Sequence, residues 1–258
     1  MKCGIIGYPL NNPRSIVIWN DYFSKKNIKA IMKSYEVNPN QFDTFIKKIK
    51  KDKTYYAFAI TMPYKISVIK YCDRLDKSAE LAKTVNLIVK NKKTSEIVGF
   101  NTDVIGAYKS ISKNIDEYKV ITIIGLGGVG TCIHNYLSYL LPKINFNLIT
   151  QKNIKTSKKN KIYKKLSSNI LKKKSLIINC TPLGSNLKDE FLTKSPIKEN
   201  LFQQINKKSF IFDVVYEPKK TELSKLALSR SIKYINGMRM INLQGKEALK
   251  IAFKNINV

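Results

Sequence analysis

Glycines that follow a short apolar run have the spacing of a phosphate-binding turn. Val120 to Ile124 is typical of a buried strand, and Gly125, Gly127, Gly128 and Gly130 come directly after it, at the start of a segment with helical periodicity. Without side chains in this turn, backbone amides and a helix N-terminus can approach a pyrophosphate. The four glycines are therefore predicted to contact a dinucleotide, and a structural turn in another kind of α/β domain is the alternative.

The end of the next predicted strand, Phe146 to Thr150, indicates which dinucleotide is bound. An Asp or Glu at this point would hold the adenosine ribose of NAD. No acidic residue stands between positions 117 and 189, and the strand is followed by Lys152, Asn153 and Lys155. These residues could face a 2′-phosphate, which favours NADP(H), although any lysine of this chain could be a solvated surface charge.

The composition predicts an ordinary folded, soluble protein. The 258 residues are 43% hydrophobic, enough for one large core or two modest ones. No apolar stretch approaches the roughly 20 residues that span a bilayer, and prolines and asparagines soon interrupt the apolar N-terminus. The four cysteines are far apart and there is one histidine, so we expect reduced cytoplasmic thiols and no metal site.

The formal charge of +29 raises the possibility of nucleic-acid binding. The lysines, however, are scattered along the whole chain, without an aromatic-basic platform or a known nucleic-acid module. We expect them on solvated faces, where they would attract an anionic substrate and a phosphorylated cofactor. Nucleic-acid binding stays an alternative, and it predicts tight association with a steep dependence on salt.

The periodicity predicts alternating strands and helices in both halves of the chain. A helix capped by Ser15 and running to Phe23 is expected near the N-terminus, and another helix is expected to begin at Thr221. Lysine-rich segments of helix length separate the later strands, which predicts a parallel sheet covered on both faces. The remaining predicted elements are strands at 2–7, 30–37, 56–60, 175–180 and 210–214, a hairpin of 85–89 with 96–100, and helices around 42–49 and at 238–255.

Motifs along nearly the whole chain resemble those of the shikimate dehydrogenase family. Their order also matches that family, and seven motifs in the right order are far more specific than one. They are Gly7-Tyr8-Pro9-Leu10, Thr61-Met62-Pro63-Tyr64-Lys65, Gly99-Phe100-Asn101-Thr102-Asp103-Val104-Ile105-Gly106, Gly125-Leu126-Gly127-Gly128, Asn179-Cys180-Thr181-Pro182-Leu183-Gly184, Asp213-Val214-Val215-Tyr216-Glu217-Pro218 with Thr221, and Gly237-Met238 through Gln244-Gly245.

This resemblance implies an α/β protein of two domains. Residues 1–103 plus 238–258 would form a substrate domain, to which the C-terminal helix returns. Residues 104–237 would form a Rossmann-like, doubly wound parallel-sheet domain that binds NADP(H), with Gly237 as a further cofactor contact. The implied activity is the reversible, NADPH-dependent reduction of 3-dehydroshikimate to shikimate, in the biosynthesis of chorismate and the aromatic amino acids.

The resemblance also implies the residues of the chemical site. Lys65 would supply charge and a proton to the developing alkoxide, and Asp103 would orient Lys65 and hold a substrate hydroxyl. Outside its motif, Lys65 would be taken for a surface lysine. Substrate hydroxyls would be bound by Thr61, Asn86 and Gln244, and the substrate carboxylate by Ser15 and Tyr216.

Three positions depart from the family pattern. Pro13 replaces the first serine of a Ser-x-Ser pair, Leu87 replaces a threonine after Asn86, and Ala59 stands where asparagine is common. A lost hydrogen bond to a charged group costs on the order of 1.5 to 3 kcal/mol, so we expect weaker substrate binding with the reaction type unchanged.

Two further interpretations stay open alongside nucleic-acid binding. One is a quinate or dual quinate/shikimate dehydrogenase that uses NAD, against which the missing acidic residue argues. The other is a degenerate homologue without turnover, for which Pro13 and Leu87 speak and against which the retained Lys65 and Asp103 argue. The sequence does not decide between a monomer and a homodimer.

Overall fold

The structure is a computed structural model, and it describes residues 1–10, 13–153 and 159–254. The chain forms two compact units. Unit 1 comprises Met1–Gly106 and the chain from Leu243 onward, and unit 2 comprises Ala107–Asn242. The assignment of residues 1–103 plus 238–258 to the substrate and of 104–237 to NADP stays a prediction.

Unit 1 is built on a six-stranded mixed sheet with the order β2-β1-β3-β5-β6-β4. The first three strands are parallel, and β5 is antiparallel to both β3 and β6, which confirms the predicted hairpin. Its elements are β1 (Lys2–Gly7), α1 (Arg14–Lys25), β2 (Ile31–Glu36), α2 (Pro39–Lys51), β3 (Tyr55–Ile60), the 3₁₀ helix η1 (Ser67–Tyr71), β4 (Arg74–Leu75), α3 (Lys77–Ala82), β5 (Leu87–Lys90) and β6 (Ile97–Phe100).

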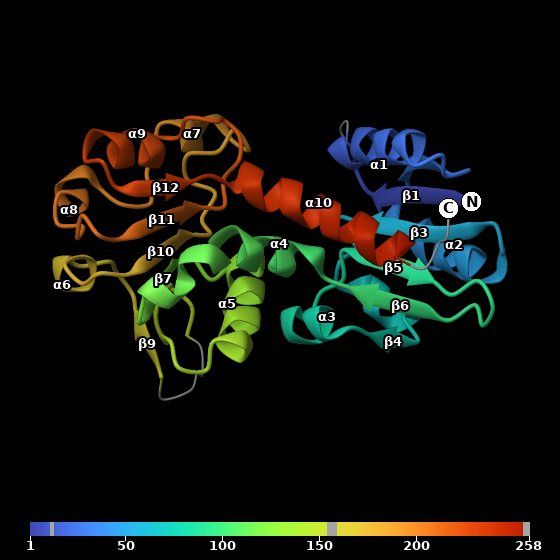
Figure 1. The fold of residues 1–258 in the computed structure, drawn as a ribbon, viewed down its shortest axis with the longest axis horizontal. Coiled ribbons are helices and arrows are strands. Elements are labelled where there is room, and N and C mark those ends of the chain that lie inside the picture. Colours follow the sequence, from blue (N-terminus) through green and yellow to red (C-terminus); the bar gives the residue numbers. More distant parts are fainter. Residues whose placement is uncertain (11–12, 154–158, 255–258) are drawn as a thin grey trace. The chain divides into compact units, whose positions relative to one another are not determined.

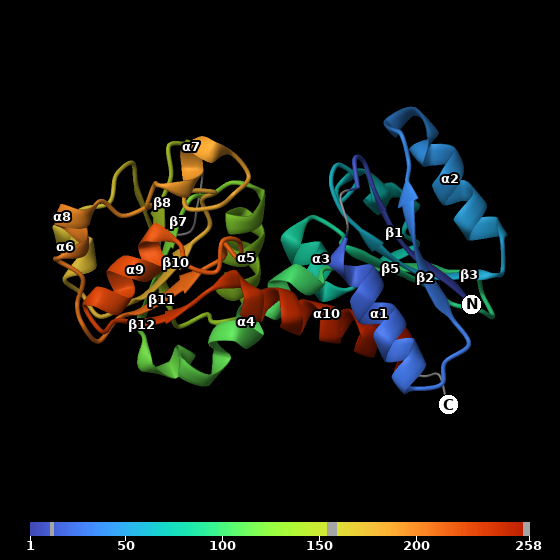
Figure 2. The ribbon, with the colours of Figure 1, turned by 90° about the horizontal axis from the view of Figure 1, so that it is seen from above.

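Helices cover both faces of this sheet (Figure 2). On one face, Trp19 and Phe23 of α1 pack with Leu249 and Phe253 of α10 (Gly237–Phe253). On the other face, α2, η1 and α3 bury a second cluster around Phe58. The helical spacing of Phe42, Ile46 and Ile49 in α2 supplies much of that second core.

Unit 2 contains a six-stranded sheet in which every pairing is parallel, with the order β12-β11-β10-β7-β8-β9 (Figure 1). Two helices, α4 (Thr102–Ile111) and α10, have residues in both units. The other elements are the 3₁₀ helix η2 (Ser112–Glu117), β7 (Val120–Ile124), α5 (Gly128–Leu140), β8 (Asn145–Ile149), β9 (Asn160–Tyr163), α6 (Ser168–Leu171), β10 (Leu176–Asn179), α7 (Asp189–Leu192), α8 (Glu199–Phe202), β11 (Phe210–Asp213), α9 (Glu222–Ser229) and β12 (Lys233–Ile235).

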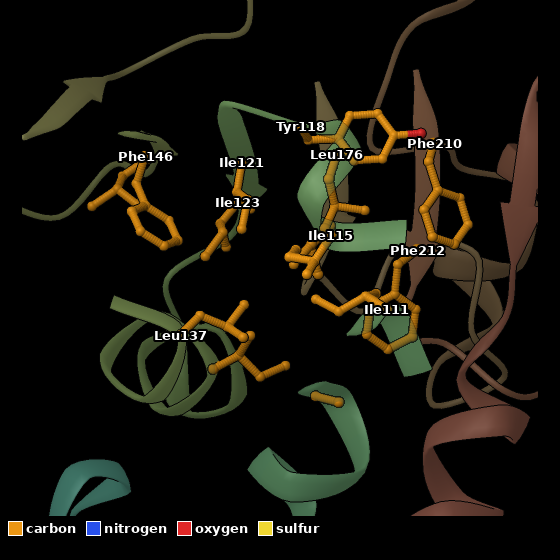
Figure 3. Packing of buried hydrophobic residues seen from close by; sticks show 14 of the residues in the cluster. Ile111, Ile115, Tyr118, Ile121, Ile123, Leu137, Phe146, Leu176, Phe210 and Phe212 are labelled. Carbon is orange, nitrogen blue, oxygen red and sulfur yellow. The ribbon is translucent and has the colours of Figure 1, made fainter. Parts of the chain in front are cut away.

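The strands of unit 2 send alternate side chains into two cores. Ile123, Leu176 and Phe212 lie in the core shown in Figure 3, with residues of α4, η2 and α5. Ile177 and Ile211 enter the opposite core, which α6, α8 and α9 complete. This burial on both faces is the doubly wound α/β arrangement that the apolar strands predict.

Two local predictions were wrong. Ser15 does not cap α1: Pro13 is the N-cap residue, no side chain caps the helix, and the amide of Ile16 donates to the carbonyl of Pro13 at 3.2 Å. The helix thus begins two residues earlier than predicted, with Ser15 already inside it. The lysine-rich segment between β8 and β10 is not one long helix, because its described residues include the edge strand β9 and the short helix α6.

Among the described residues, no helix combines the length and the apolar character needed to cross a membrane.

Candidate active site

The loop after β3 places Lys65 next to Asp103. The Nζ atom of Lys65 donates to Oδ2 of Asp103 at 2.6 Å, and the two side chains are 32% and 28% exposed. The pair is therefore accessible to a small molecule. Thirty-eight positions separate the two residues in the chain, so it is the fold that brings them together.

Backbone contacts and a buried ring fix the loop that carries Lys65. The carbonyl of Lys65 accepts from the amide of Val85 at 2.7 Å. Within the loop, Tyr64 is buried, stacks on Phe42 with ring centroids 4.0 Å apart, and donates its hydroxyl to the carbonyl of Val37. The lysine therefore extends from a backbone that is held on both sides.

Asp103 lies in the first turn of α4, where the helix dipole favours a negative charge. The side chain of Asn101 prepares this turn, since its Oδ1 accepts from the amide of Val104 at 3.2 Å. Its Nδ2 donates to the hydroxyl of Thr84 at 2.7 Å, which ties the helix start to the segment before β5. The orientation of Asp103 thus rests on buried polar contacts.

A second chain of hydrogen bonds joins Asn86, Thr102 and Gln244. Asn86 is 7% exposed, accepts from the amide of Thr102 at 2.7 Å and donates its Nδ2 to the hydroxyl of Thr102 at 3.0 Å. The same hydroxyl donates to Oε1 of Gln244 at 3.0 Å. Thr102 was given no role in the sequence analysis, although its place between Asn101 and Asp103 in one motif was a signal.

The other two residues of unit 1 expected to bind substrate lie outside these contacts. Thr61 is half-buried at the end of β3, and its Cγ2 would lie 2.5 Å from a Cβ added at Gly7, so the two segments touch. The hydroxyl of Ser15 is buried and has no hydrogen-bond partner among the described residues. Of the five substrate-binding candidates, the structure joins Asn86 and Gln244 through Thr102.

Two of the departures lie in or beside the core of unit 1. Leu87 is fully buried in the cluster under α1 and α10, with Trp19 among its members. Ala59 pairs with Leu87 in the sheet and packs against the same cluster. The apolar side chain of Leu87 thus contributes packing where a hydroxyl would need a hydrogen-bond partner.

The four glycines that follow β7 in unit 2 differ in why a residue without a side chain stands at each position. Gly125 has a φ of +88°, which favours glycine, and a Cβ at Gly130 would lie 2.0 Å from the carbonyl oxygen of Gly125. A Cβ at Gly127 or Gly128 would meet no described atom within 4 Å. Gly125 and Gly130 are thus needed for the turn and for close packing, and the other two leave open space at the start of α5.

A pocket of about 320 Å³ lies beside this open turn, entirely within unit 2. Tyr216, predicted to contact the substrate carboxylate, lines it and is 39% exposed. Gly237 supports the same wall, since its amide donates to the carbonyl of Val215 at 3.0 Å and a Cβ there would lie 2.0 Å from the oxygen of Val214. The pocket is lined by Gly127, Gly128, Val129, Cys180, Thr181, Pro182, Ser185, Asn186, Leu187, Val214, Val215, Tyr216 and Glu217.

Lys152 and Asn153, two of the three residues predicted to face a 2′-phosphate, follow the carboxyl end of β8. The amide of Lys152 donates to the hydroxyl of Thr150 at 3.1 Å, and Oδ1 of Asn153 accepts from Nζ of Lys164 at 2.7 Å. Lys155 lies outside the described residues. Lys164 carries no signal in the sequence, because it is the pairing of β8 with β9 that brings it to this turn.

Comparison with known proteins gives consistent results at the level of families, sequences and structures. Residues 5–88 match the family described as shikimate dehydrogenase substrate binding domain. The shikimate dehydrogenase (NADP(+)) of Clostridium botulinum strain Loch Maree is 32% identical over 256 residues, covering 95% of this chain and 94% of the relative. That of Methanocaldococcus jannaschii is 28% identical over 266 residues, covering 96% and 89%.

Solved structures of shikimate dehydrogenases have a fold similar to that of this chain. The crystal structure of shikimate dehydrogenase from Aquifex aeolicus has a TM-score of 0.80 at 25% identity, covering 98% of this chain and 92% of that one. A shikimate dehydrogenase in complex with NADP⁺ has a TM-score of 0.77 at 26% identity, covering 98% and 90%. From its sequence, its motifs and its fold, this chain belongs to the shikimate dehydrogenase family.

Proposed function

We propose that this protein is an NADP(H)-dependent shikimate dehydrogenase, which reduces 3-dehydroshikimate to shikimate reversibly in the biosynthesis of chorismate and aromatic amino acids. The observation that carries the proposal is the Lys65–Asp103 pair, 2.6 Å apart and partly exposed, in a chain of this family. The curated relatives are shikimate dehydrogenases that use NADP⁺, and one solved relative was crystallised with NADP⁺.

Lys65 is the proton donor of the proposed reaction. When bound, NADPH would supply a hydride from a C–H bond of its nicotinamide and become NADP⁺; the hydride adds to the ring carbonyl carbon while the C=O π bond breaks. The ammonium of Lys65 stabilises the negative charge that develops on oxygen and gives it a proton, leaving a neutral amine that solvent reprotonates. Asp103 holds the ammonium in place and is free to accept from a substrate hydroxyl through its second oxygen.

Asn86 and Gln244 are proposed to bind substrate hydroxyls, with Thr102 fixing their positions. The hydroxyl of Thr102 contacts both side chains, so it restricts which way each amide can turn. Thr61, Ser15 and Tyr216 are proposed as further substrate contacts. The hydroxyl of Ser15 is buried and has no hydrogen-bond partner among the described residues, which supports a role as a donor to the carboxylate that Pro13 cannot share.

Unit 2 is proposed to bind the cofactor, within the predicted limits 104–237, and unit 1 the substrate, within 1–103 plus 238–258. The open space at Gly127 and Gly128 fits a pyrophosphate at the start of α5, and Gly125, Gly130 and Gly237 maintain the backbone around it. Lys152, Asn153 and Lys155 are proposed to face the 2′-phosphate of NADP(H).

The test is the loss of NADPH absorbance with 3-dehydroshikimate, beside NADH and beside the variant Lys65→Ala. Oxidation of NADPH that the variant loses is the expected result. A strong preference for NADH would overturn the cofactor assignment and favour a quinate/shikimate dehydrogenase. No turnover with either cofactor at saturating substrate would favour a degenerate homologue.

Two further proposals concern the cellular compartment and the oligomeric state. We propose a cytoplasmic enzyme that acts on a small-molecule substrate, because the four dispersed cysteines, all of them among the described residues, form no disulfide. Size-exclusion chromatography with light scattering decides between monomer and homodimer, and a gel shift at physiological salt tests the nucleic-acid alternative.

A further inference from the structure

A lysine outside every motif lies at the turn where the cofactor's ribose is expected. Strands β8 and β9 are parallel, with Ile149 opposite Tyr163, and the amide of Thr150 donates to the carbonyl of Tyr163 at 3.0 Å. The residue after β9 is Lys164, so it emerges at the same carboxyl edge as the turn after β8. Ligands of open parallel sheets bind at this edge.

The ammonium of Lys164 is bound by the backbone and side chains of that turn. Its Nζ donates to the carbonyl of Gln151 at 2.8 Å and to Oδ1 of Asn153 at 2.7 Å, and it lies 3.4 Å from the carbonyl of Lys152. In return, Nε2 of Gln151 donates to the carbonyl of Lys164 at 2.6 Å. These contacts fix a positive charge within the turn and fix the turn around it.

This arrangement has two consequences for an anion at the turn. The amide oxygen of Asn153 is occupied by a cation, so its amide nitrogen is left to act as a donor. The backbone that carries Lys152 is held by Lys164, and no acidic residue between positions 117 and 189 opposes the positive charge. Both consequences favour a phosphate over the free hydroxyls of a ribose.

We propose that Lys164 is a specificity-determining residue for NADP(H), because it positions the turn after β8 that contacts the 2′-phosphate and adds its own positive charge to that turn. The proposal rests on the proposed function in one respect, namely that unit 2 binds a dinucleotide. A purely structural role for Lys164 would affect nucleotides with and without the 2′-phosphate equally.

The test compares Lys164→Met with the matched variant Lys161→Met, which removes the same charge from an exposed position of β9. Calorimetry with adenosine 2′,5′-bisphosphate and with 5′-AMP measures the phosphate preference without any turnover. We expect Lys164→Met to weaken the bisphosphate about tenfold, which corresponds to about 1.4 kcal/mol, and to leave 5′-AMP unchanged. Lys161→Met should change neither constant.

Kinetics provide a second readout. The KM for NADPH should rise by about the same factor in Lys164→Met, with kcat and the KM for NADH unchanged. Equal weakening of both nucleotides, or no weakening, would overturn the role of Lys164. A wild type that binds the bisphosphate but does not reduce 3-dehydroshikimate would instead refute the proposed function, and the binding comparison would still decide the role of Lys164.

Discussion

Two aspartates, one in each unit, show how the surroundings of a carboxylate decide whether it can take part in a reaction or only stabilise the fold. Asp103 is partly exposed and accepts from the ammonium of Lys65 at 2.6 Å. Asp213, at the end of β11, is fully buried and accepts from neutral donors. An exposed charge pair can exchange protons and contact a ligand, whereas a buried carboxylate with its hydrogen bonds satisfied can only hold its neighbours.

The donors to Asp213 come from four different segments of unit 2. Burial raises the pKa of the Asp213 carboxyl, and the hydrogen bonds that it accepts oppose that rise. Because Asn179 also accepts from the amide of Thr181, the network reaches two walls of the pocket beside the glycine turn. The donors are Nδ2 of Asn179 at 2.9 Å and the amide of Val215, the hydroxyl of Thr221 and the hydroxyl of Tyr234, each at 3.1 Å.

The largest effect is expected from removing the exposed ammonium. Lys65→Met should lower kcat by about 10²- to 10⁴-fold, because the proton donor and its charge are both lost. The free energy of unfolding should change by less than about 1 kcal/mol, since a partly exposed ion pair contributes little. Steady-state kinetics and urea unfolding of the same preparation measure both quantities, and a large loss of stability would contradict the contrast with Asp213.

The next effect in size concerns the buried carboxylate. Asp213→Ala should lower the free energy of unfolding by about 3 kcal/mol or more, because it leaves several buried donors without an acceptor. Tyr234→Phe removes one of these donors and should cost only about 1 kcal/mol. Urea unfolding distinguishes the two variants, and equal losses would mean that Asp213 does not organise the network.

The turn after β7 contains one glycine that the fold needs and one that is expected to contact the cofactor, so the contrast between stability and binding can be tested there as well. Gly130→Ala should destabilise the fold by about 2 kcal/mol, because its Cβ would lie 2.0 Å from the oxygen of Gly125. Gly127→Ala has free space around its Cβ and should leave the melting temperature nearly unchanged while weakening NADP⁺ binding. Thermal unfolding and calorimetry check the pair, and intact NADP⁺ affinity in Gly127→Ala would argue against this turn as the pyrophosphate site.

The sequence predicts those parts of the fold in which local pattern and burial agree. The buried strand Val120–Ile124 and the antiparallel pair β5–β6 lie where the apolar pattern and the turn residues place them. The edge strands β9 and β12 were missed, because they are short and partly exposed and each contains a lysine, so they carry no strong apolar pattern.

The candidate site was predictable only as far as motifs named its residues. The motifs contain Lys65 and Asp103, but the contact between them depends on the pairing of distant strands. The contacts of Asp213 with Asn179, and of Lys164 with the turn after β8, join residues 34 and 11 to 13 positions apart. No local periodicity encodes such polar pairs, since each depends on how the strands are ordered in the sheet.

The smallest expected effect is a pH dependence of stability that comes from a second lysine of unit 1, which is buried where Lys65 is partly exposed. Lys90 is 3% exposed and donates to the carbonyls of Ile49 and Asp52 at 2.9 Å, at the end of α2. Burial lowers the pKa of Lys90, so over the pH range between its folded and its unfolded pKa the unfolded chain binds more protons than the folded one. Stability should therefore rise with pH across that range.

Lys90→Met removes this titration and serves as the control for it. From neutral pH toward the ordinary lysine pKa, the wild type should gain about 1 kcal/mol or less relative to the variant, since a tenfold change in proton affinity corresponds to about 1.4 kcal/mol. Urea unfolding at a series of pH values measures the difference. Parallel curves would show that Lys90 binds its proton equally well in both states, and that its burial, unlike the exposure of Lys65, has no consequence for its chemistry.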